Sequence, residues 1–261
     1  MLLAVDIGNS MVNVGAFDGE HLVANLRVST DARRSPDEYG LILRNLLELN
    51  GIDPSVVTDV CMCSVVPPLT GVFEELIQTY FSVKPLTVTA GVRTGLQISY
   101  DNPRDVGADR IVDAVAAIEL YGPPVIIVDF GTATVFDAVS RDGVYLGGAI
   151  APGINVAAEA LFLNTSQLRR VELVAPELAI GQNTTAALQS GLVLGYAGLV
   201  TGLVNRFKKE LGADAKVVGT GGLAGIISTV ADVFDTINQD LTLIGLRMVY
   251  AKNRPPSRVL D

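Results

Sequence analysis

Two stretches of the chain, 123 residues apart, repeat one pattern, and this repeat restricts the possible folds more than any other feature. The stretches read VDIGNSMVNVGAFDG and VDFGTATVFDAVSRDG. In each, an apolar strand ends in Asp-x-Gly and small polar residues, a second strand follows, and an Asp-Gly turn ends the repeat. Asp6 aligns with Asp129, and an ungapped alignment places Met11 against Thr134. Because the offset is close to half of the 261 residues, we predict an internal duplication.

The segments around each copy predict strands alternating with helices, so the expected fold class is α/β. In the first copy, a meander of three strands leads into a helix that Ser35 caps, with Glu38 completing a capping box. The second copy continues with a third strand, a helix, one long helix or two, a strand with a glycine turn, and a closing helix. We expect two lobes, residues 1–116 and 117–261, that face each other across a cleft.

Charge and histidine content exclude several classes of function. The formal net charge is −9 and the pI is about 4.6, whereas nucleic-acid-binding proteins normally carry a basic surface, so we expect no nucleic-acid partner. His21 is the single histidine and lies in a predicted surface turn. This argues against catalysis by a histidine base and against a histidine-ligated metal.

The cysteines and the apolar segments bear on localisation. Cys61 and Cys63 point to the same face of one predicted strand, and no further metal ligands lie nearby in the sequence, so buried thiols are favoured over a metal site. Two such cysteines and the lack of a signal peptide indicate the cytoplasm. The longest apolar stretch, residues 192–204, is interrupted by glycines and too short to span a bilayer, so we expect no membrane association.

The two Asp-x-Gly sites allow a structural and a functional interpretation. Each aspartate could simply cap a tight hairpin. In the functional interpretation, backbone N–H groups at Gly8 and Gly131 approach a phosphate, and the carboxylates of Asp6 and Asp129 hold a cation that neutralises it. The hydroxyl groups of Ser10, Thr132 and Thr134 would add donors. The duplication favours this second interpretation, and the sequence contains no Walker A motif.

Two further motifs carry polar chemistry. VVGTGGLAG matches the dinucleotide fingerprint, but only about 40 residues follow it, so a nucleotide resting on the Gly221-Gly222 turn is the better interpretation. In DVGADRIV, Asp105 could cap a helix, with Asp109 as a first-turn acid and Arg110 as a surface charge. Alternatively, Asp109 orients a hydroxyl group as a base and Arg110 binds an anion.

Taken together, the motifs resemble the type III pantothenate kinase family of the acetate-and-sugar-kinase/actin-like superfamily. They occur in order along nearly the whole chain: DIGNS, SVVPP, YDNPRDVGADRIVDAVAA, VDFGTATVFDAV, YLGGAIAPG, ALFLNTSQL, IGQNTTAALQSG, TGGLA and DLTLIGLR. The resemblance implies two ribonuclease H-like lobes and ATP-dependent phosphorylation of pantothenate to 4′-phosphopantothenate, the first step of coenzyme A biosynthesis. It also implies a homodimer that uses Mg²⁺ with ATP and a monovalent cation, K⁺ or NH₄⁺.

The resemblance implies roles for individual residues. Asp109 would be the proton acceptor, Asp129 would bind the monovalent cation, and Thr132 would contact ATP. The turn for the ATP phosphates would comprise Asp6, Ile7, Gly8, Asn9, Ser10, Met11, Val12 and Asn13, with Met11 standing where the family often has a small or polar residue. The pantothenate contacts would be Tyr100, Gly107, Ala108, Asp109, Arg110 and Thr184.

Two other functions are compatible with the same fold. One is a non-catalytic regulator, which the retained Asp109 and Asp129 and the acidic charge disfavour. The other is a different small-molecule kinase of the superfamily, for instance a sugar or acetate kinase. The GADR and NTTAALQSG segments argue against it, because they resemble acceptor-site motifs rather than phosphate-site motifs.

Overall fold

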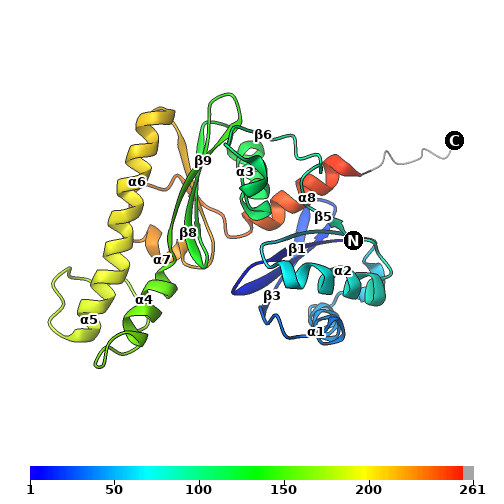
Figure 1. The fold of residues 1–261 in the computed structure, drawn as a ribbon, viewed down its shortest axis with the longest axis horizontal. Helices are drawn as coiled ribbons and strands as arrows, with labels where there is room; N and C mark the ends of the chain where they lie inside the picture. Colours follow the sequence, from blue (N-terminus) through cyan, green and yellow to red (C-terminus); the bar gives the residue numbers. More distant parts are fainter. Residues whose placement is uncertain (255–261) are drawn as a thin grey trace. The chain divides into compact units, whose positions relative to one another are not determined.

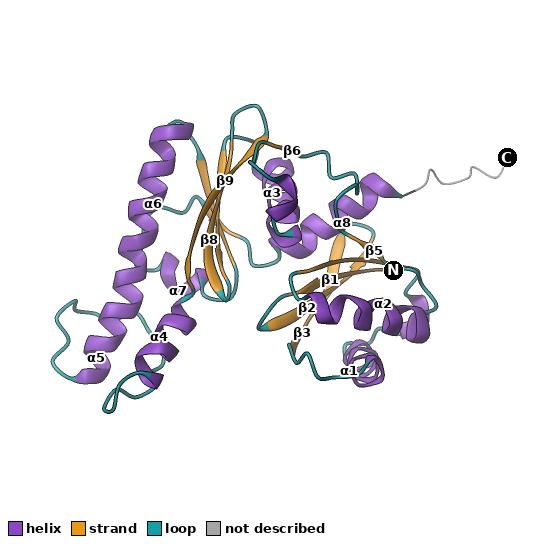
Figure 2. Cartoon of the chain, viewed as in Figure 1, coloured by secondary structure: helices purple, strands orange, loops and turns teal. Residues whose placement is uncertain are grey.

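The computed structural model describes residues 1–254, which form two mixed sheets with helices packed against them (Figures 1 and 2). The strands are β1 (Leu2–Ile7), β2 (Met11–Asp18), β3 (His21–Ser29), β4 (Asp59–Ser64), β5 (Leu86–Thr87), β6 (Gln97–Ile98), β7 (Val125–Phe130), β8 (Ala133–Val139), β9 (Val144–Pro152), β10 (Lys216–Thr220) and β11 (Thr236–Ile237). The α-helices are α1 (Pro36–Leu49), α2 (Pro67–Phe81), α3 (Ala108–Tyr121), α4 (Ile154–Leu163), α5 (Thr184–Gln189), α6 (Gly195–Leu211), α7 (Ala224–Ser228) and α8 (Leu241–Asn253). Short helical segments are η1 (Pro54–Val56), η2 (Pro103–Asp105) and the π-helical η3 (Ser190–Leu194).

The first sheet has the strand order β3-β2-β1-β4-β5. Strands β1 to β3 form an antiparallel meander, and β4 joins β1 in parallel. On one face, apolar side chains such as Val5 and Ile7 pack with α1 and α2 into a buried core. Because side chains alternate along a strand, Asp6 points to the opposite face. The Asp6 side chain therefore lies on the face of the sheet away from the core that α1 and α2 cover.

The second sheet repeats the path of the first. Its order is β11-β10-β7-β8-β9-β6, with an antiparallel meander of β7 to β9 and with β10 parallel to β7. The order β3-β2-β1-β4-β5 therefore recurs as β9-β8-β7-β10-β11, and β6 adds a strand beside β9. This recurrence confirms the predicted duplication and the class of two ribonuclease H-like α/β lobes.

The turn between the first two strands differs in length between the copies. The N–H of Gly8 donates to the carbonyl of Met11, three residues later, at 3.0 Å. The N–H of Gly131 donates to the carbonyl of Ala133, only two residues later, also at 3.0 Å. The strand register consequently places Thr134 where Val12 lies in the first copy. The ungapped alignment of Met11 with Thr134 is therefore wrong, because the second turn is one residue shorter.

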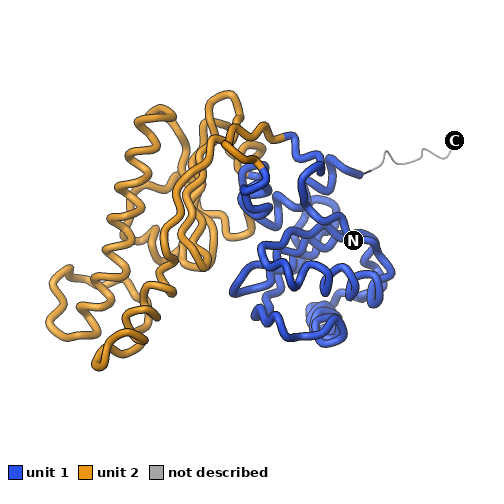
Figure 3. Tube along the Cα trace, in the orientation of Figure 1, with its two compact units in different colours: residues 1–95, 104–116, 242–261 blue, residues 96–103, 117–241 orange. Residues whose placement is uncertain are grey.

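The chain divides into two compact units that differ from the expected lobes in two segments (Figure 3). Unit 1 comprises residues 1–95, 104–116 and 242–261, and unit 2 comprises residues 96–103 and 117–241. The C-terminal segment belongs to unit 1 because α8 packs there, with Leu243 against Gly15 and Gly245 directly on the backbone of Val112. Residues 96–103 belong to unit 2 because β6 pairs with β9.

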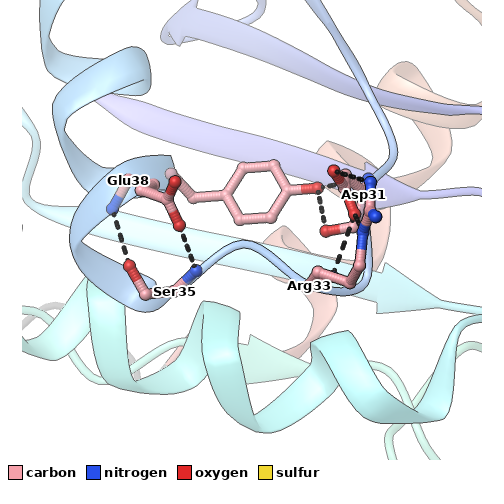
Figure 4. A network of polar contacts seen from close by, with 5 residues as sticks. Asp31, Arg33, Ser35 and Glu38 are labelled. Atoms are coloured by element: carbon pink, nitrogen blue, oxygen red, sulfur yellow. Dashed lines mark hydrogen bonds and ion pairs between the residues drawn. The ribbon is translucent and has the colours of Figure 1, made fainter.

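Local signals in the sequence place the start of α1. The Ser35 hydroxyl accepts a hydrogen bond from the N–H of Glu38, whose carboxylate accepts one from the N–H of Ser35 at 2.7 Å, which confirms the capping box (Figure 4). Just before the helix, the N–H of Arg33 donates to the Asp31 carboxylate. The hydroxyl of Tyr39, from the first turn, bonds to both the N–H and the carbonyl of Asp31. The start of α1 is thus held by the capping box, and the segment before it is held by the contacts of Asp31 with Arg33 and Tyr39.

One continuous helix runs through α5, η3 and α6, from Thr184 to Leu211, over 28 residues. By length and composition alone this helix could cross a membrane, and the apolar stretch of residues 192–204 is only part of it. Apolar side chains on one side of this helix, including Val193, Val200 and Val204, are buried in the core of unit 2. A helix that forms part of a core passes the same length and composition test.

Candidate active site

Three polar side chains form a row across β2, β1 and β4 in unit 1. Asn13 and Cys63 lie on either side of Asp6 at the same level of the sheet. The Asn13 amide donates to Oδ2 of Asp6 at 3.0 Å, and the Cys63 thiol donates to Oδ1 at 3.5 Å. Each carboxylate oxygen therefore has its own donor, and the orientation of Asp6 is set by both neighbouring strands.

The electrostatic environment of this row raises the pKa of Asp6 to about 6. Burial is the main cause, and the negative charge of Asp109 adds to it, while the hydrogen bonds from Asn13 and Cys63 act in the opposite direction. Burial also raises the pKa of the Cys63 thiol well above its usual range. A cluster of two carboxylates with a raised pKa on Asp6 is typical of a functional site.

The turn after β1 exposes the residues expected to face phosphate. Asn9, Ser10 and Met11 are exposed, whereas the side chains of Ile7 and Val12 are fully buried in the core. The turn is fixed to the end of β3, because the hydroxyl of the next residue after that strand, Thr30, donates to the Gly8 carbonyl at 2.7 Å. Of the eight residues expected in the phosphate turn, Ile7 and Val12 could contact a phosphate only through their backbone.

Asp109 lies in the first turn of α3, where its carboxylate folds back over the preceding glycine. Oδ1 of Asp109 accepts the N–H of Arg110 at 2.8 Å. A β-carbon on Gly107 would lie 2.4 Å from that oxygen, so this position must be glycine for the carboxylate to lie there. Burial raises the pKa of Asp109, and the N–H and charge of Arg110 partly offset this. A carboxyl group with a raised pKa is better suited to act as a general base.

In unit 2, Asp129 takes the position that Asp6 holds in unit 1. Its neighbours at the same level of the sheet are Val135 and Thr220 rather than an amide and a thiol. Gly221 follows β10 with a φ of +85°, and a β-carbon there would lie 2.4 Å from Oδ1 of Asp129. The backbone of Gly221 thus packs directly against this carboxylate, and a side chain at this position would displace it. The predicted Gly221-Gly222 turn and Asp129 thus form one cluster.

The acidic side chain of this cluster is the single carboxylate of Asp129. Within residues 1–254, no group of three or more His, Cys, Asp or Glu side chains could hold a metal ion. Asp129 is therefore not part of such a group. The structure also shows that Thr134 is fully buried, so it cannot serve as the phosphate donor expected from the sequence.

The remaining expected residues of unit 2 lie at the ends of its elements. Thr132 is exposed in the short turn after β7, where the N–H of Gly153 donates to its carbonyl at 3.0 Å. Thr184 is exposed at the start of α5, which Asn183 caps by accepting the N–H of Ala186 at 2.9 Å. Tyr100 follows β6 and is partly exposed.

Comparison with known proteins decides the family. The sequence profile of the type III pantothenate kinase family matches residues 2–206. The type III pantothenate kinase of Dehalococcoides mccartyi (strain BAV1) is 52% identical over 253 residues, covering 97% of this chain and 96% of that protein. The chain belongs to the type III pantothenate kinase family. A further relative of the same name, from Myxococcus xanthus, is 51% identical and covers 97% of this chain and 99% of its own length.

Solved structures of more distant proteins confirm the fold of this family member. A Campylobacter jejuni protein described as a conserved Baf family transcriptional activator aligns with a TM-score of 0.59 at 20% identity over 96% of this chain and 98% of its own. Component A of (R)-2-hydroxyglutaryl-CoA dehydratase from Acidaminococcus fermentans aligns with a TM-score of 0.53 at 14% identity over 96% and 98%. Likenesses at this identity establish the fold alone.

The sequence did not reveal that Cys63 contacts Asp6 of the DIGNS motif. Cys63 was interpreted only as a buried thiol or a metal ligand, yet it donates to Asp6. The signal available was its position on a strand that could pair with β1, but the register that places it beside Asp6 is a tertiary property. Asn13 was expected to contact ATP, and the structure shows that its amide donates a hydrogen bond to Asp6.

Proposed function

We propose that the chain transfers the γ-phosphoryl group of ATP to pantothenate and so forms 4′-phosphopantothenate. The observation that carries this proposal is the pair of carboxylates in unit 1. Asp6 stands at the start of an exposed turn, and Asp109, with a raised pKa, stands at the start of α3. Family membership supports ATP as donor and pantothenate as acceptor.

In this proposal each residue has a defined task. The turn from Asp6 to Asn13 binds the ATP phosphates, and Thr132 and the Gly221-Gly222 turn add contacts to the nucleotide. Asp109 accepts the proton of the acceptor hydroxyl and directs its oxygen toward the γ-phosphate. Phosphoryl transfer proceeds through a loose transition state, so positioning and charge compensation matter more than base strength. For pantothenate we propose contacts with Tyr100, Gly107, Ala108, Arg110 and Thr184.

Two cations complete the proposal. Mg²⁺ accompanies ATP and neutralises phosphate charge, with Asp6 as the carboxylate closest to the phosphate turn. Asp129 would hold K⁺ or NH₄⁺. We further propose a cytoplasmic homodimer. Free, buried thiols at Cys61 and Cys63 are compatible with that reducing compartment.

An ATP-consumption assay tests the proposal. Pantothenate is compared with a panel of sugars and with acetate, each in potassium and in sodium buffers. We expect turnover with pantothenate alone and a strong requirement for potassium or ammonium. Turnover with a sugar but not with pantothenate would contradict the substrate, and equal rates in sodium would contradict the cation role of Asp129.

Asp109→Asn tests the base. We expect turnover to fall by at least about a hundredfold, because general-base catalysis contributes about 10²–10⁴-fold. ATP binding, measured by calorimetry, should persist. Asp105→Asn, which removes the same charge from an exposed position four residues earlier, is the matched control and should retain turnover. Near-wild-type activity of Asp109→Asn would remove this residue as the base.

A further inference from the structure

The backbone before Tyr100 is fixed to the edge of the second sheet. Ile98 of β6 is in register with Tyr145 of β9, and the N–H of Ser99 donates to the Tyr145 carbonyl at 2.8 Å. The Tyr100 side chain itself is 37% exposed. Its ring therefore starts from a defined place on β9 and still presents a surface to solvent.

Gly147 of β9 lies directly against this ring. A β-carbon on Gly147 would lie 2.8 Å from Cε2 and 3.0 Å from Cδ2 of Tyr100, which is closer than such carbons normally approach. The φ of Gly147 is +113°, a conformation that residues with a side chain rarely adopt. Any side chain at this position would displace the ring.

The duplicated sheet offers an internal comparison for this position. The ladder between β8 and β9 skips Leu146 and resumes at Gly147. In unit 1 the ladder between β2 and β3 skips Val23 in the same way and resumes at Ala24, whose φ is not positive. A bulge at this place in the fold therefore does not itself require glycine. Two features distinguish the bulge in unit 2: the positive φ of Gly147 and the Tyr100 ring that lies against it.

A second support for the ring comes from a buried polar pair. The centroid of the Tyr145 ring is 6.5 Å from that of Tyr100, and the two planes are tilted by 50°. Tyr145 is fully buried, and its hydroxyl donates to Oδ1 of Asp137 at 2.6 Å, with Asp137 only 2% exposed. A short hydrogen bond to a buried carboxylate strongly restricts the Tyr145 ring.

We propose that Gly147, together with the Tyr145–Asp137 pair, positions the Tyr100 ring and thereby sets the affinity for the acceptor substrate. This inference rests on the proposed function, in which Tyr100 contacts pantothenate. Gly147, Tyr145 and Asp137 are positioning residues, because they act through Tyr100. A binding group whose own support fixes its orientation loses less freedom when the substrate binds.

Gly147→Ala is the direct test, with steady-state kinetics for both substrates. The added methyl group displaces the Tyr100 ring from the position in which it contacts pantothenate. KM for pantothenate should therefore rise roughly tenfold. KM for ATP should stay within about twofold of the wild type, since a displaced acceptor contact leaves the nucleotide contacts in place. Tyr145→Phe should shift KM for pantothenate in the same direction. Thermal unfolding confirms that each variant is folded.

Two controls separate positioning from backbone strain. Gly91→Ala places a methyl group at a φ of +105° with nothing within 4 Å, and Gly143→Ala does the same at +75° in the β8–β9 hairpin. Both should leave KM for pantothenate unchanged. In a Tyr100→Ala background, Gly147→Ala should add little further effect, because the ring that it displaces is gone.

The outcomes distinguish this inference from the proposed function. If the wild type does not phosphorylate pantothenate, the proposed function fails. If the wild type does so, but Gly147→Ala behaves like Gly91→Ala, only the positioning role fails. A rise in KM for pantothenate that persists undiminished in the Tyr100→Ala background would also overturn the positioning role.

Discussion

Asp6 is held by two donors of unequal strength. The amide of Asn13 is a good hydrogen-bond donor, whereas a thiol such as Cys63 is a weak one. The hydrogen bonds consequently only partly offset the burial of the carboxylate, and its pKa remains near 6. The residue is thus kept in place at the expense of folding stability, a pattern common at functional sites.

Replacing Asp6 by asparagine should therefore stabilise the protein in a pH-dependent way. The pKa of Asp6 rises from 3.8 to about 6 on folding, so ionisation above pH 6 disfavours the folded state. An asparagine side chain at this position carries no such charge. The free energy of unfolding of Asp6→Asn should match that of the wild type near pH 4 and exceed it by about 2–3 kcal/mol above pH 7.

Urea unfolding between pH 4 and pH 8 measures this difference, and catalytic activity should be lost in parallel. Asp18→Asn, at the exposed end of β2, serves as the control for the loss of one charge. A constant difference between Asp6→Asn and the wild type across this pH range would contradict the role assigned to burial.

At the scale of elements, sequence patterns predicted those strands and helices that carry their own signals. Capping at Ser35 placed the start of α1, and the repeated Asp-x-Gly pattern predicted both meanders. The two-residue strands β6 and β11 have no pattern of their own, because each exists only through pairing with a distant strand. The partners of Asp6 and the support of Tyr100 escaped prediction for the same reason, since register is set by tertiary structure.

The capping box of α1 permits a prediction for one helix. Ser35→Ala removes the side-chain acceptor for the N–H of Glu38 and should lower the free energy of unfolding by about 1 kcal/mol. Ser35→Thr keeps an acceptor at the same place and should recover most of this loss. Chemical denaturation of both variants is the measurement. Equal stability of Ser35→Ala and the wild type would show that packing of Tyr39 fixes the helix start without the cap.

At the scale of the whole molecule, unit 2 exposes several large apolar side chains. Leu163, Leu178 and Ile180, on α4 and in the segment before α5, are 69%, 70% and 84% exposed. Large exposed apolar side chains are a common feature of interaction surfaces, and we propose that the homodimer covers these three.

Leu163→Asp should therefore shift the protein from dimer to monomer in sedimentation velocity, because it would place a charge in an apolar interface. Leu49→Asp, at the end of α1 with 82% exposure, adds the same charge in unit 1 and should leave the dimer intact. A monomeric wild type, or equal dissociation of both variants, would contradict the assignment of the interface to unit 2.

The membership of α8 in unit 1 has a consequence for biosynthesis. Tyr250 donates a hydrogen bond to Asp59, Arg247 pairs with Glu20, and Gly245 lies on Val112, so the last helix contacts segments made much earlier. A ribosome releases a chain from its N-terminus onward. Unit 1, whose first strands emerge early, consequently acquires α8 only after residues 117–241 of unit 2 have been synthesised.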